Sequence, residues 1–260
     1  MLIFVTMKKT LITLAAAIAA LTACGNNKNA EMKDTECFKT PGGGKVEIAC
    51  IRHGSIAIDF NGYSIQIDPV AEMDGEVIDY NKFGKADAIF VTHEHYDHLS
   101  QDAIDTLSKE GTLLFANAAS VAKMGCGTAL ANGDSGLLTD KIKFAVVPAY
   151  NTTEGRDRFH PKGNGNGYLF NIDGLVVYVA GDTEVIPEMA ELQSIYGKVD
   201  VAFLPVNQPY TMTVDQCVEA AQIIRPAVLV PYHFSQTDLS ALPGMLEGSG
   251  IEVRIHESLK

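Results

Sequence analysis

Residues 91–100, VTHEHYDHLS, gather side chains that bind metal ions into one short stretch. Three of the chain's seven histidines lie here within six residues, together with a glutamate and an aspartate. Imidazole nitrogen and carboxylate oxygen are the ligands that Zn²⁺ and similar ions take in proteins. In extended backbone residues i and i+2 point the same way, so His93 and His95 can share one ion. A turn after them would aim Asp97 and His98 at a second point. The spacing therefore predicts two adjacent ions rather than a polar loop with chance histidines.

Two further ligand candidates lie far downstream, each at the end of a predicted strand. Asp182 ends the run LVVYVAGD, and His233 ends AVLVPYH. A carboxylate has two oxygens and can bridge paired metals, which is the role expected of Asp182. Its alternative role is a helix N-cap, because a predicted helix follows GDT. The alternative for His233 is a core histidine beside aromatic residues.

The first ion needs a third imidazole, and three histidines compete for this place. His160 lies in the long Gly- and Asn-rich loop NTTEGRDRFHPKGNGNG, and flexibility of that loop would let His160 fold over the site. His53 follows the first predicted strand, and His256 lies near the end of the chain. We prefer His160, because a loop histidine without a packing role otherwise has no evident purpose. For His53, a structural and a functional role are both open.

The pattern beyond these residues is a series of short strands and amphipathic helices. Strands are predicted over residues 45–51, 55–60, 63–69, 86–92, 113–116, 141–150, 168–182 (a hairpin), 199–206, 227–233 and 251–257. Helices are predicted over residues 100–111, 184–197, 213–225 and 238–250. Alternating strands and helices of this kind fit a sheet-on-sheet core with helices outside. A doubly wound parallel sheet is the alternative, but two-residue hairpin turns argue against it.

One internal sequence repeat indicates two similar halves. SIAIDFNGYSIQID and YLFNIDGLVVYVAGD share one design, which is a strand, an Asx-Gly turn, a second strand and then an aspartate, Asp68 or Asp182. A further strand follows each of them and ends in a polar residue, His93 in the first case and Asn207 in the second. Each half is therefore expected to offer polar groups from its strand ends to a common site.

Composition limits the class of protein. The chain has 260 residues, of which 47% are hydrophobic, enough for one large domain or two small ones. The formal charge is -12, and an acidic body repels phosphate backbones. A nucleic-acid partner is therefore disfavoured, whereas a small and even anionic substrate remains compatible. The sequence does not indicate an oligomeric state.

The N-terminal segment resembles a bacterial lipoprotein signal. A basic MKK precedes the apolar run TLITLAAAIAALTA, which is short for a bilayer span and ends at Cys24. We expect residues 1–23 to be a signal peptide, Cys24 to carry a lipid, and residues 24–44 to be a flexible tether to a domain over residues 45–260. The protein is then exported and anchored to the cell envelope. An ordinary secretory signal and a transmembrane anchor are the alternatives.

Export would place the cysteines where disulfides can form. With Cys24 lipidated, four cysteines remain, and three pairings of them are possible. Cys37 and Cys50 could pair and pin the N-terminal tail to the first strand. No CxxC motif is present, so a thiolate zinc site is disfavoured.

The pattern H-x-H-x-D-H, followed far downstream by GD and by a lone histidine at a strand end, resembles the metallo-β-lactamase superfamily. The resemblance covers nearly all of residues 45–260. The stretches RHGSIAIDFNGYSIQIDP, HPKGNGNGYLF and YVAGDTEVIPEM are similar to a branch with L-ascorbate 6-phosphate lactonase-like hydrolases, and N-acyl-phosphatidylethanolamine phospholipase D is a more distant relative. The resemblance to the superfamily implies a single-domain, four-layer αββα sandwich of the α/β (α+β) class, with a dinuclear site at one edge between the sheets.

The resemblance carries seven ligands over to this sequence. Those of the first ion are His93, His95 and His160, and those of the second are Asp97, His98 and His233. Asp182 would bridge the two ions, which are expected to be zinc, with manganese or iron also compatible. Asp68 matches a family aspartate that orients a ligand imidazole, although it also fits a simple strand-end turn before a proline.

The sequence thus predicts a metal-dependent hydrolase. A hydroxide activated by two metals would attack a small ester, lactone or phosphoester. Asp97 and Asp182 are the candidate catalytic carboxylates, with Asp97 placed to hold or shuttle the proton. Three cationic side chains in the His160 loop are candidate anion binders, unless the loop is simply solvated: Arg156, Arg158 and Lys162. The candidates for the pocket wall are Tyr150, Asn207 and Tyr210. A β-lactamase and a non-catalytic metal- or ligand-binding lipoprotein are the alternative functions.

Overall fold

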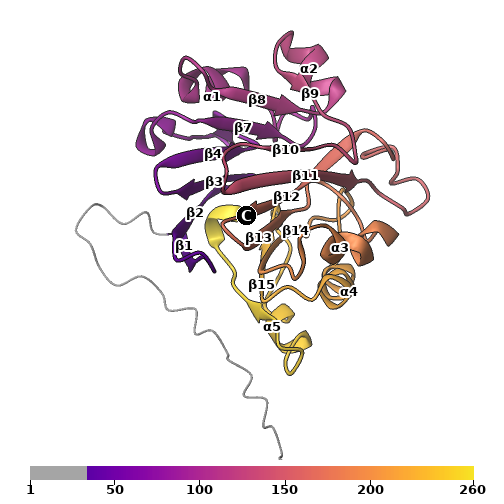
Figure 1. Cartoon of the computed structure of the whole chain (residues 1–260). Helices are drawn as coiled ribbons and strands as arrows, with labels where there is room; N and C mark the ends of the chain where they lie inside the picture. The colour runs from indigo at the N-terminus through magenta and orange to yellow at the C-terminus, as the bar shows by residue number, and fades with distance from the viewer. Residues whose placement is uncertain (1–33) are drawn as a thin grey trace, which may run out of the picture.

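Two seven-stranded sheets pack face to face in the computed structural model, which describes residues 34–260 (Figure 1). The first sheet has the strand order β1-β2-β3-β4-β7-β8-β9. Its strands are β1 (Thr35–Lys39), β2 (Lys45–Arg52), β3 (Ser55–Phe60), β4 (Tyr63–Ile67), β7 (Ala88–Val91), β8 (Leu113–Ala116) and β9 (Thr128–Ala129). A separate small ribbon pairs β5 (Glu72–Met73) with β6 (Glu76–Val77).

The second sheet repeats this plan with the later half of the chain. Its order is β10-β11-β12-β13-β14-β15-β16. The strands are β10 (Ser135–Leu137), β11 (Ile142–Ala149), β12 (Gly165–Ile172), β13 (Leu175–Val179), β14 (Val201–Pro205), β15 (Val228–Tyr232) and β16 (Glu252–Val253). In both sheets the first four strands are antiparallel and the rest are parallel. The predicted internal repeat of two similar halves is therefore confirmed, and a doubly wound parallel sheet is excluded.

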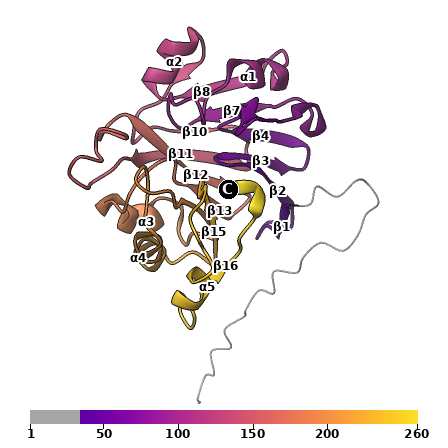
Figure 2. The ribbon, with the colours of Figure 1, turned by 180° about the vertical axis from the view of Figure 1, so that it is seen from behind.

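Helices cover the outer faces of the two sheets, and the four-layer prediction is confirmed. In Figures 1 and 2, α1 and α2 lie on one side of the strands and α3, α4 and α5 on the other. Their bounds are α1 (Gln101–Leu107), α2 (Ala118–Met124), α3 (Leu192–Tyr196), α4 (Val214–Ile224) and α5 (Leu242–Met245). Three 3₁₀ turns complete the described elements: η1 (Tyr80–Phe83), η2 (Pro187–Glu191) and η3 (Glu257–Leu259). Among residues 34–260, no helix is both long and apolar enough to span a bilayer.

Aromatic side chains fill the space between the sheets. Phe90 of β7 is fully buried, and its ring lies 5.0–5.1 Å from the rings of Phe115, Phe144, Tyr168 and Phe170. The last three come from the second sheet, so one side chain of the first sheet packs against several of its partner. Edge-to-face pairs of this kind add to the burial of apolar area. This core keeps the strand ends of both halves at a fixed separation.

Three expected helices are shorter than predicted. α1 stops at Leu107 rather than near residue 111, because Ser108 leaves the helical conformation. The predicted helix over residues 184–197 begins only at Pro187, as a 3₁₀ turn. Residues 238–250 hold the single turn α5. Pro and Gly within or near these segments limit helical hydrogen bonding.

The expectation of a flexible tether over residues 24–44 is wrong for its second half. Thr35–Lys39 form β1, which pairs antiparallel with β2. Phe38 of this strand is buried in the core, and its apolar area favours pairing over a free tether. The signal segment, Cys24 and the start of the tether lie outside the described residues.

The suggested Cys37–Cys50 disulfide is also wrong. Cys50 is a free, buried thiol, and Cys37 lies opposite Glu47 in the β1–β2 register. Cys50 is three residues further along β2, which places it roughly 10 Å from the position opposite Cys37. A disulfide requires Cα atoms within about 7 Å.

Candidate metal centre

The candidate ligands come from loops at one edge of both sheets. His93–His98 follow β7, Asp182 follows β13, and His233 follows β15. These are strands in the parallel part of each sheet, and parallel strands deliver their carboxyl ends to the same edge. The internal repeat thus places ligands from both halves of the chain around one point. His160 lies in the loop before β12, and His53 in the turn between β2 and β3.

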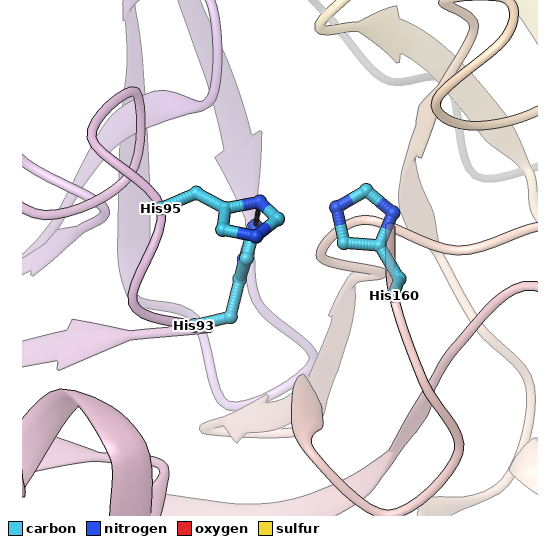
Figure 3. A group of neighbouring side chains, drawn as sticks. All are labelled: His93, His95 and His160. Carbon is cyan, nitrogen blue, oxygen red and sulfur yellow. Dashed lines mark hydrogen bonds between the residues drawn. The ribbon is translucent and has the colours of Figure 1, made fainter. Parts of the chain in front are cut away.

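Three imidazoles form the first ligand group, His93, His95 and His160 (Figure 3). Nε2 of His93 lies 3.0 Å from Nδ1 of His95. The His160 ring faces this pair from the loop of the second half, with ring centroids 5.1 Å from His93 and 5.0 Å from His95. The structure therefore brings together the three residues predicted for the first ion. His256 lies elsewhere, against Glu36 of β1.

Asp182 occupies the middle of the centre, as expected of a bridging carboxylate. Its Oδ2 lies 3.2 Å from Nε2 of His160 and 3.2 Å from Nε2 of His233. Its Oδ1 lies 3.3 Å from Nε2 of His98. The carboxylate is 3% exposed and makes no helix cap, because the next helical turn begins at Pro187.

The second ligand group departs from the prediction. Asp97 and His233 gather with His53, whereas His98 gathers with His93 and Asp182. Oδ2 of Asp97 lies 3.4 Å from Nε2 of His233 and 3.5 Å from Nε2 of His53. All of the predicted ligands are present in the centre. The sequence pattern did not reveal that His53 joins them, although a histidine directly after a buried strand was a usable signal.

Asp68 and Thr92 orient two of the imidazoles by contacts to their Nδ1 atoms. Oδ2 of Asp68 lies 2.7 Å from Nδ1 of His98, and Thr92 donates to Asp68 through its N–H and its hydroxyl, each at 2.7 Å. The Thr92 hydroxyl also lies 2.9 Å from Nδ1 of His93. Burial lowers the pKa of His98, but the carboxylates of Asp182 and Asp68 raise it well above its ordinary value. The predicted role of Asp68 thus fits its position, and Thr92 is a supporting residue that sequence reasoning missed.

Two further contacts hold the first group in place. The main-chain oxygen of Tyr210 lies 3.0 Å from Nδ1 of His160. The Glu94 carboxylate, between the two histidines of the motif, accepts hydrogen bonds from the side-chain amides of Asn117 and Asn164 at 3.0–3.1 Å. Since Asn164 belongs to the His160 loop, Glu94 joins the two segments that carry the first ligand group.

The backbone at three of these positions is strained. His53, Asp68 and His233 have φ values of 53°, 46° and 49°, in the left-handed region that favours glycine. Non-glycine residues in this region are held there by surrounding contacts and concentrate at functional sites. The strain is consistent with side chains that must be aimed at a common point.

The donor set fits divalent metal ions. Several buried polar atoms of the centre have no hydrogen-bond partner; they are His53 Nε2, His98 Nε2, His160 Nε2, Asp182 Oδ1, His233 Nδ1 and His233 Nε2. Unpaired polar atoms are rare in protein interiors, because burial without a partner costs free energy. Imidazole nitrogens and carboxylate oxygens that converge in this way are the ligand set of zinc, manganese and iron sites.

Electrostatics favour the ionised, metal-binding form of the two carboxyl groups of the centre. Burial alone would raise the pKa of Asp182, but His233, His98 and His160 outweigh it and hold that pKa well below the usual range. For Asp97, His233 and His53 likewise outweigh burial and lower the pKa. Both carboxyl groups are therefore ionised at neutral pH, as metal ligation requires.

The cations of the His160 loop are mostly engaged with acidic partners. Nη1 of Arg156 lies 3.3 Å from Glu184, and Nζ of Lys162 lies 3.0 Å from Glu188. Arg158 lies over the ring of the following residue, 4.8 Å from its centroid. These contacts satisfy Arg156 and Lys162 within the protein, so Arg158 is the remaining anion-binding candidate of the three.

The predicted pocket-wall residues differ in exposure. Tyr150 is buried, and its hydroxyl donates to Glu188 at 2.9 Å. Asn207 bonds through its main chain to Thr211. Tyr210 is 45% exposed, and Tyr96 of the histidine motif is 77% exposed. Tyr96 thus lies exposed within a ligand-bearing loop, and Tyr210 is exposed next to the main-chain contact with His160.

Comparison with known proteins shows the family of the chain. Residues 47–233 match the family model of a β-lactamase superfamily domain. The chain belongs to the β-lactamase superfamily. It is 30% identical over 194 residues to a UPF0173 metal-dependent hydrolase of Thermococcus kodakarensis, covering 73% of this chain and 85% of the relative.

Two solved structures show the same fold. One, from Parabacteroides distasonis and assigned as a metal-dependent hydrolase, is 48% identical, covers 86% of this chain and 98% of its own, and superposes with a TM-score of 0.81. Igni18, a metallo hydrolase from Ignicoccus hospitalis, is 26% identical, covers 83% and 96%, and has a TM-score of 0.67. The superfamily member described here is therefore a metal-dependent hydrolase.

Proposed function

We propose that the protein hydrolyses a small ester, lactone or phosphoester with two divalent metal ions, zinc in the first instance. The observation that carries the proposal is the convergence of three ligand groups on the buried Asp182 carboxylate. A single ion would not use all these groups, because four to six ligands complete the common geometries. Resemblance to the lactonase-like branch supports the choice of ester and lactone substrates.

The metal ions, when bound, would lower the pKa of a water molecule and polarise the oxygen of the scissile bond. The chain supplies the rest. Asp182 joins the groups of His160 and His233, and Asp68 orients His98. Asp97 has a side chain that is 17% exposed against 3% for Asp182, so it is the carboxylate nearer to solvent. With a pKa held low, Asp97 stays ionised and orients a water proton by accepting its hydrogen bond.

Tyr96 of the histidine motif and Tyr210, whose main-chain oxygen contacts His160, are exposed and would offer apolar surface to the carbon skeleton of a substrate. A β-lactam remains within reach of the same chemistry, and the assay below separates it. The acidic net charge of -12 disfavours long nucleic acids as substrates or partners.

The test is metal content and hydrolysis by the full chain, beside a His95→Ala, Asp182→Ala variant. The substrate panel holds lactones, carboxylic esters, phosphodiesters and a β-lactam. We expect about two metal ions per chain and turnover of one substrate class, both lost in the variant. Equal background rates in the two proteins, whatever the substrate, would leave a binding protein rather than an enzyme.

For localisation, we propose export and a lipid anchor on Cys24, which lies outside the described residues. The support is the basic, apolar and cysteine order of residues 7–24. Expression in a bacterial host with a labelled fatty acid tests it. We expect label in the membrane fraction for the natural chain and none for Cys24→Ala; label in both, or in neither, would contradict the anchor.

A further inference from the structure

We propose that His53 is a direct ligand of the second metal ion, beside Asp97 and His233. His53 lies outside the H-x-H-x-D-H motif and outside the seven ligands carried over by the family resemblance. The inference rests on the dinuclear centre proposed above and adds a ligand to it. It makes six of the chain's seven histidines part of one site.

The spacing of the donor atoms fits one ion. Ligand atoms that each lie about 2.1 Å from a metal are roughly 3.0–3.4 Å from one another in octahedral or tetrahedral geometry. Nε2 of His53 lies 3.5 Å from Oδ2 of Asp97, which in turn lies 3.4 Å from Nε2 of His233. The rings of His53 and His233 lie at a centroid distance of 3.7 Å, tilted by 41° to each other. Small adjustments of these side chains would bring all three donors onto a common ion.

The second nitrogen of the His53 ring is held as metal-binding histidines usually are. Nδ1 lies 3.3 Å from the main-chain oxygen of Lys260. A ligand histidine commonly donates this N–H to a carbonyl, which fixes its tautomer and leaves the other nitrogen for the metal. Here Nε2 is the free nitrogen, and it is buried without a hydrogen-bond partner.

The backbone of His53 is tied into the centre as well. Its N–H donates to the carbonyl of Ser258 at 3.1 Å, and its carbonyl accepts from the N–H of His233 at 3.3 Å. Its φ of 53° shows that these bonds hold a strained conformation. The side chain is 3% exposed, so it cannot serve as a solvent-facing polar group.

The competing role is a hydrogen bond from His53 to Asp97 without metal contact. A separation of 3.5 Å is too long for an ordinary N–H···O bond, which is 2.7–3.2 Å. The two roles also predict different substitutions. A hydrogen-bond donor can be replaced by asparagine, whereas a metal ligand can be replaced only by another ligating side chain.

The experiment measures zinc binding by the full chain and by two variants, His53→Asn and His53→Asp. His256→Asn is the matched control, because His256 is the one histidine outside the centre. Zinc content is measured by elemental analysis after dialysis against zinc buffers, and a crystal structure of the zinc-loaded natural chain locates the ions.

We expect two ions in the natural chain, with Nε2 of His53 about 2.1 Å from the second. His53→Asn should keep the first ion and lose roughly 100-fold in affinity for the second, while His53→Asp and His256→Asn retain two. Two ions with His53 more than about 3 Å from both, or an unchanged second affinity in His53→Asn, would overturn the His53 assignment alone. A natural chain that binds one ion at every zinc concentration would overturn the dinuclear proposal as well.

Discussion

Asp68 illustrates how one buried carboxylate sets the direction of a ligand. It is fully buried and receives the Thr92 N–H, the Thr92 hydroxyl and Nδ1 of His98. Burial raises its pKa, although His98 opposes that effect. The carboxylate and the imidazole therefore depend on each other for a partner.

We expect Asp68→Asn to reduce metal affinity roughly 10–100-fold. Both carboxylate oxygens of Asp68 accept hydrogen bonds, whereas an amide accepts only through its oxygen. Zinc titration with a competing chelator measures the change. The control is Asp59→Asn, since Asp59 accepts only a turn N–H at the surface. Equal zinc affinity in Asp68→Asn and the natural chain would contradict the orienting role.

Gly54 matters because it leaves room for His98. A Cβ at this position would lie 2.9 Å from Cε1 of the His98 ring, closer than real contacts allow. The ring cannot move away freely, because Asp68 holds its Nδ1 at 2.7 Å. We expect Gly54→Ala to displace the ring and weaken metal binding several-fold, as measured by the same titration. Gly244→Ala, where a Cβ meets nothing within 4 Å and φ is not positive, is the control for a glycine substitution elsewhere.

Among the elements, the loop after β7 is joined to the loop before β12 by the hydrogen bonds that Asn117 and Asn164 donate to the Glu94 carboxylate. We call this group of three residues the Glu94 clamp. Asn164 contributes both an amide donor to Glu94 and a carbonyl that accepts from Asn117. His160 lies four residues before Asn164, so the clamp limits how far the loop can move from His93 and His95.

Asn164→Ala is therefore predicted to weaken binding of one ion roughly 10-fold while the other is retained, which two-step zinc titration resolves. Asn81→Ala removes an amide that bonds only to Asp79 and serves as the comparison. Loss of both ions together would indicate general unfolding of the edge rather than a clamp on one group.

Another pair of elements, β1 and the segment after β16, is joined by ionisable side chains. Glu36 of β1 bonds to His256 at 2.9 Å and contacts Arg254. The hydrogen bond to Glu36, more than any opposing burial, raises the pKa of His256. Burial raises the pKa of Glu36, but His256 and Arg254 outweigh it and lower that pKa.

These shifts give a pH prediction for His256→Gln. A histidine with a raised folded pKa adds stability below its unfolded pKa of about 6.5, and this stability is lost as pH rises through the folded value. Glu36 must also be ionised, so the contribution is largest between about pH 4.5 and 6.5. In metal-free protein, urea unfolding should show His256→Gln less stable by about 1 kcal/mol at pH 5.5, because the pair is partly open to solvent. The difference should shrink at pH 9, and a constant difference would refute the ion pair.

For the whole molecule, the metal centre is a link between two similar halves. The first sheet supplies His93, His95, Asp97 and His98, and the second supplies His160, Asp182 and His233. Metal bound by these residues would therefore connect the sheets at the edge, in addition to the aromatic core between them. Groups that bind only the folded chain stabilise it by mass action.

We expect chelation to lower the melting temperature. A free ion concentration 100 times the dissociation constant contributes about 2.7 kcal/mol, which corresponds to roughly 5–10 °C for a domain of this size. Differential scanning calorimetry with and without a chelator measures the shift. The His95→Ala, Asp182→Ala variant should show little shift, and a full-sized shift in that variant would mean that the stabilising ion lies elsewhere.

Much of this architecture is readable from the sequence because hydrophobic pattern and turn residues act locally. The hairpins at Asn61-Gly62 and Asp173-Gly174, the capped α4 and the strands before His93, Asp182 and His233 all lie where pattern predicts them. Pattern reasoning missed α2, although Asn117 as N-cap and Gly125 in the left-handed conformation at its end were available signals. It also missed β1, whose few residues gain their stability from pairing with β2 rather than from local propensity.

Residue types and their spacing are enough to predict metal chemistry here: the clustered His and Asp residues, their places at strand ends and the two repeated halves. Which of these side chains meet follows from the packing of the folded chain. His53 joins Asp97 and His233, His98 turns toward Asp182, and His256 goes to Glu36. The physical reason is that these contacts join residues distant along the chain, through loops whose direction depends on strained backbone, buried carboxylates and the packing of two sheets. The local conformational preferences of residues do not determine contacts between residues so far apart along the chain.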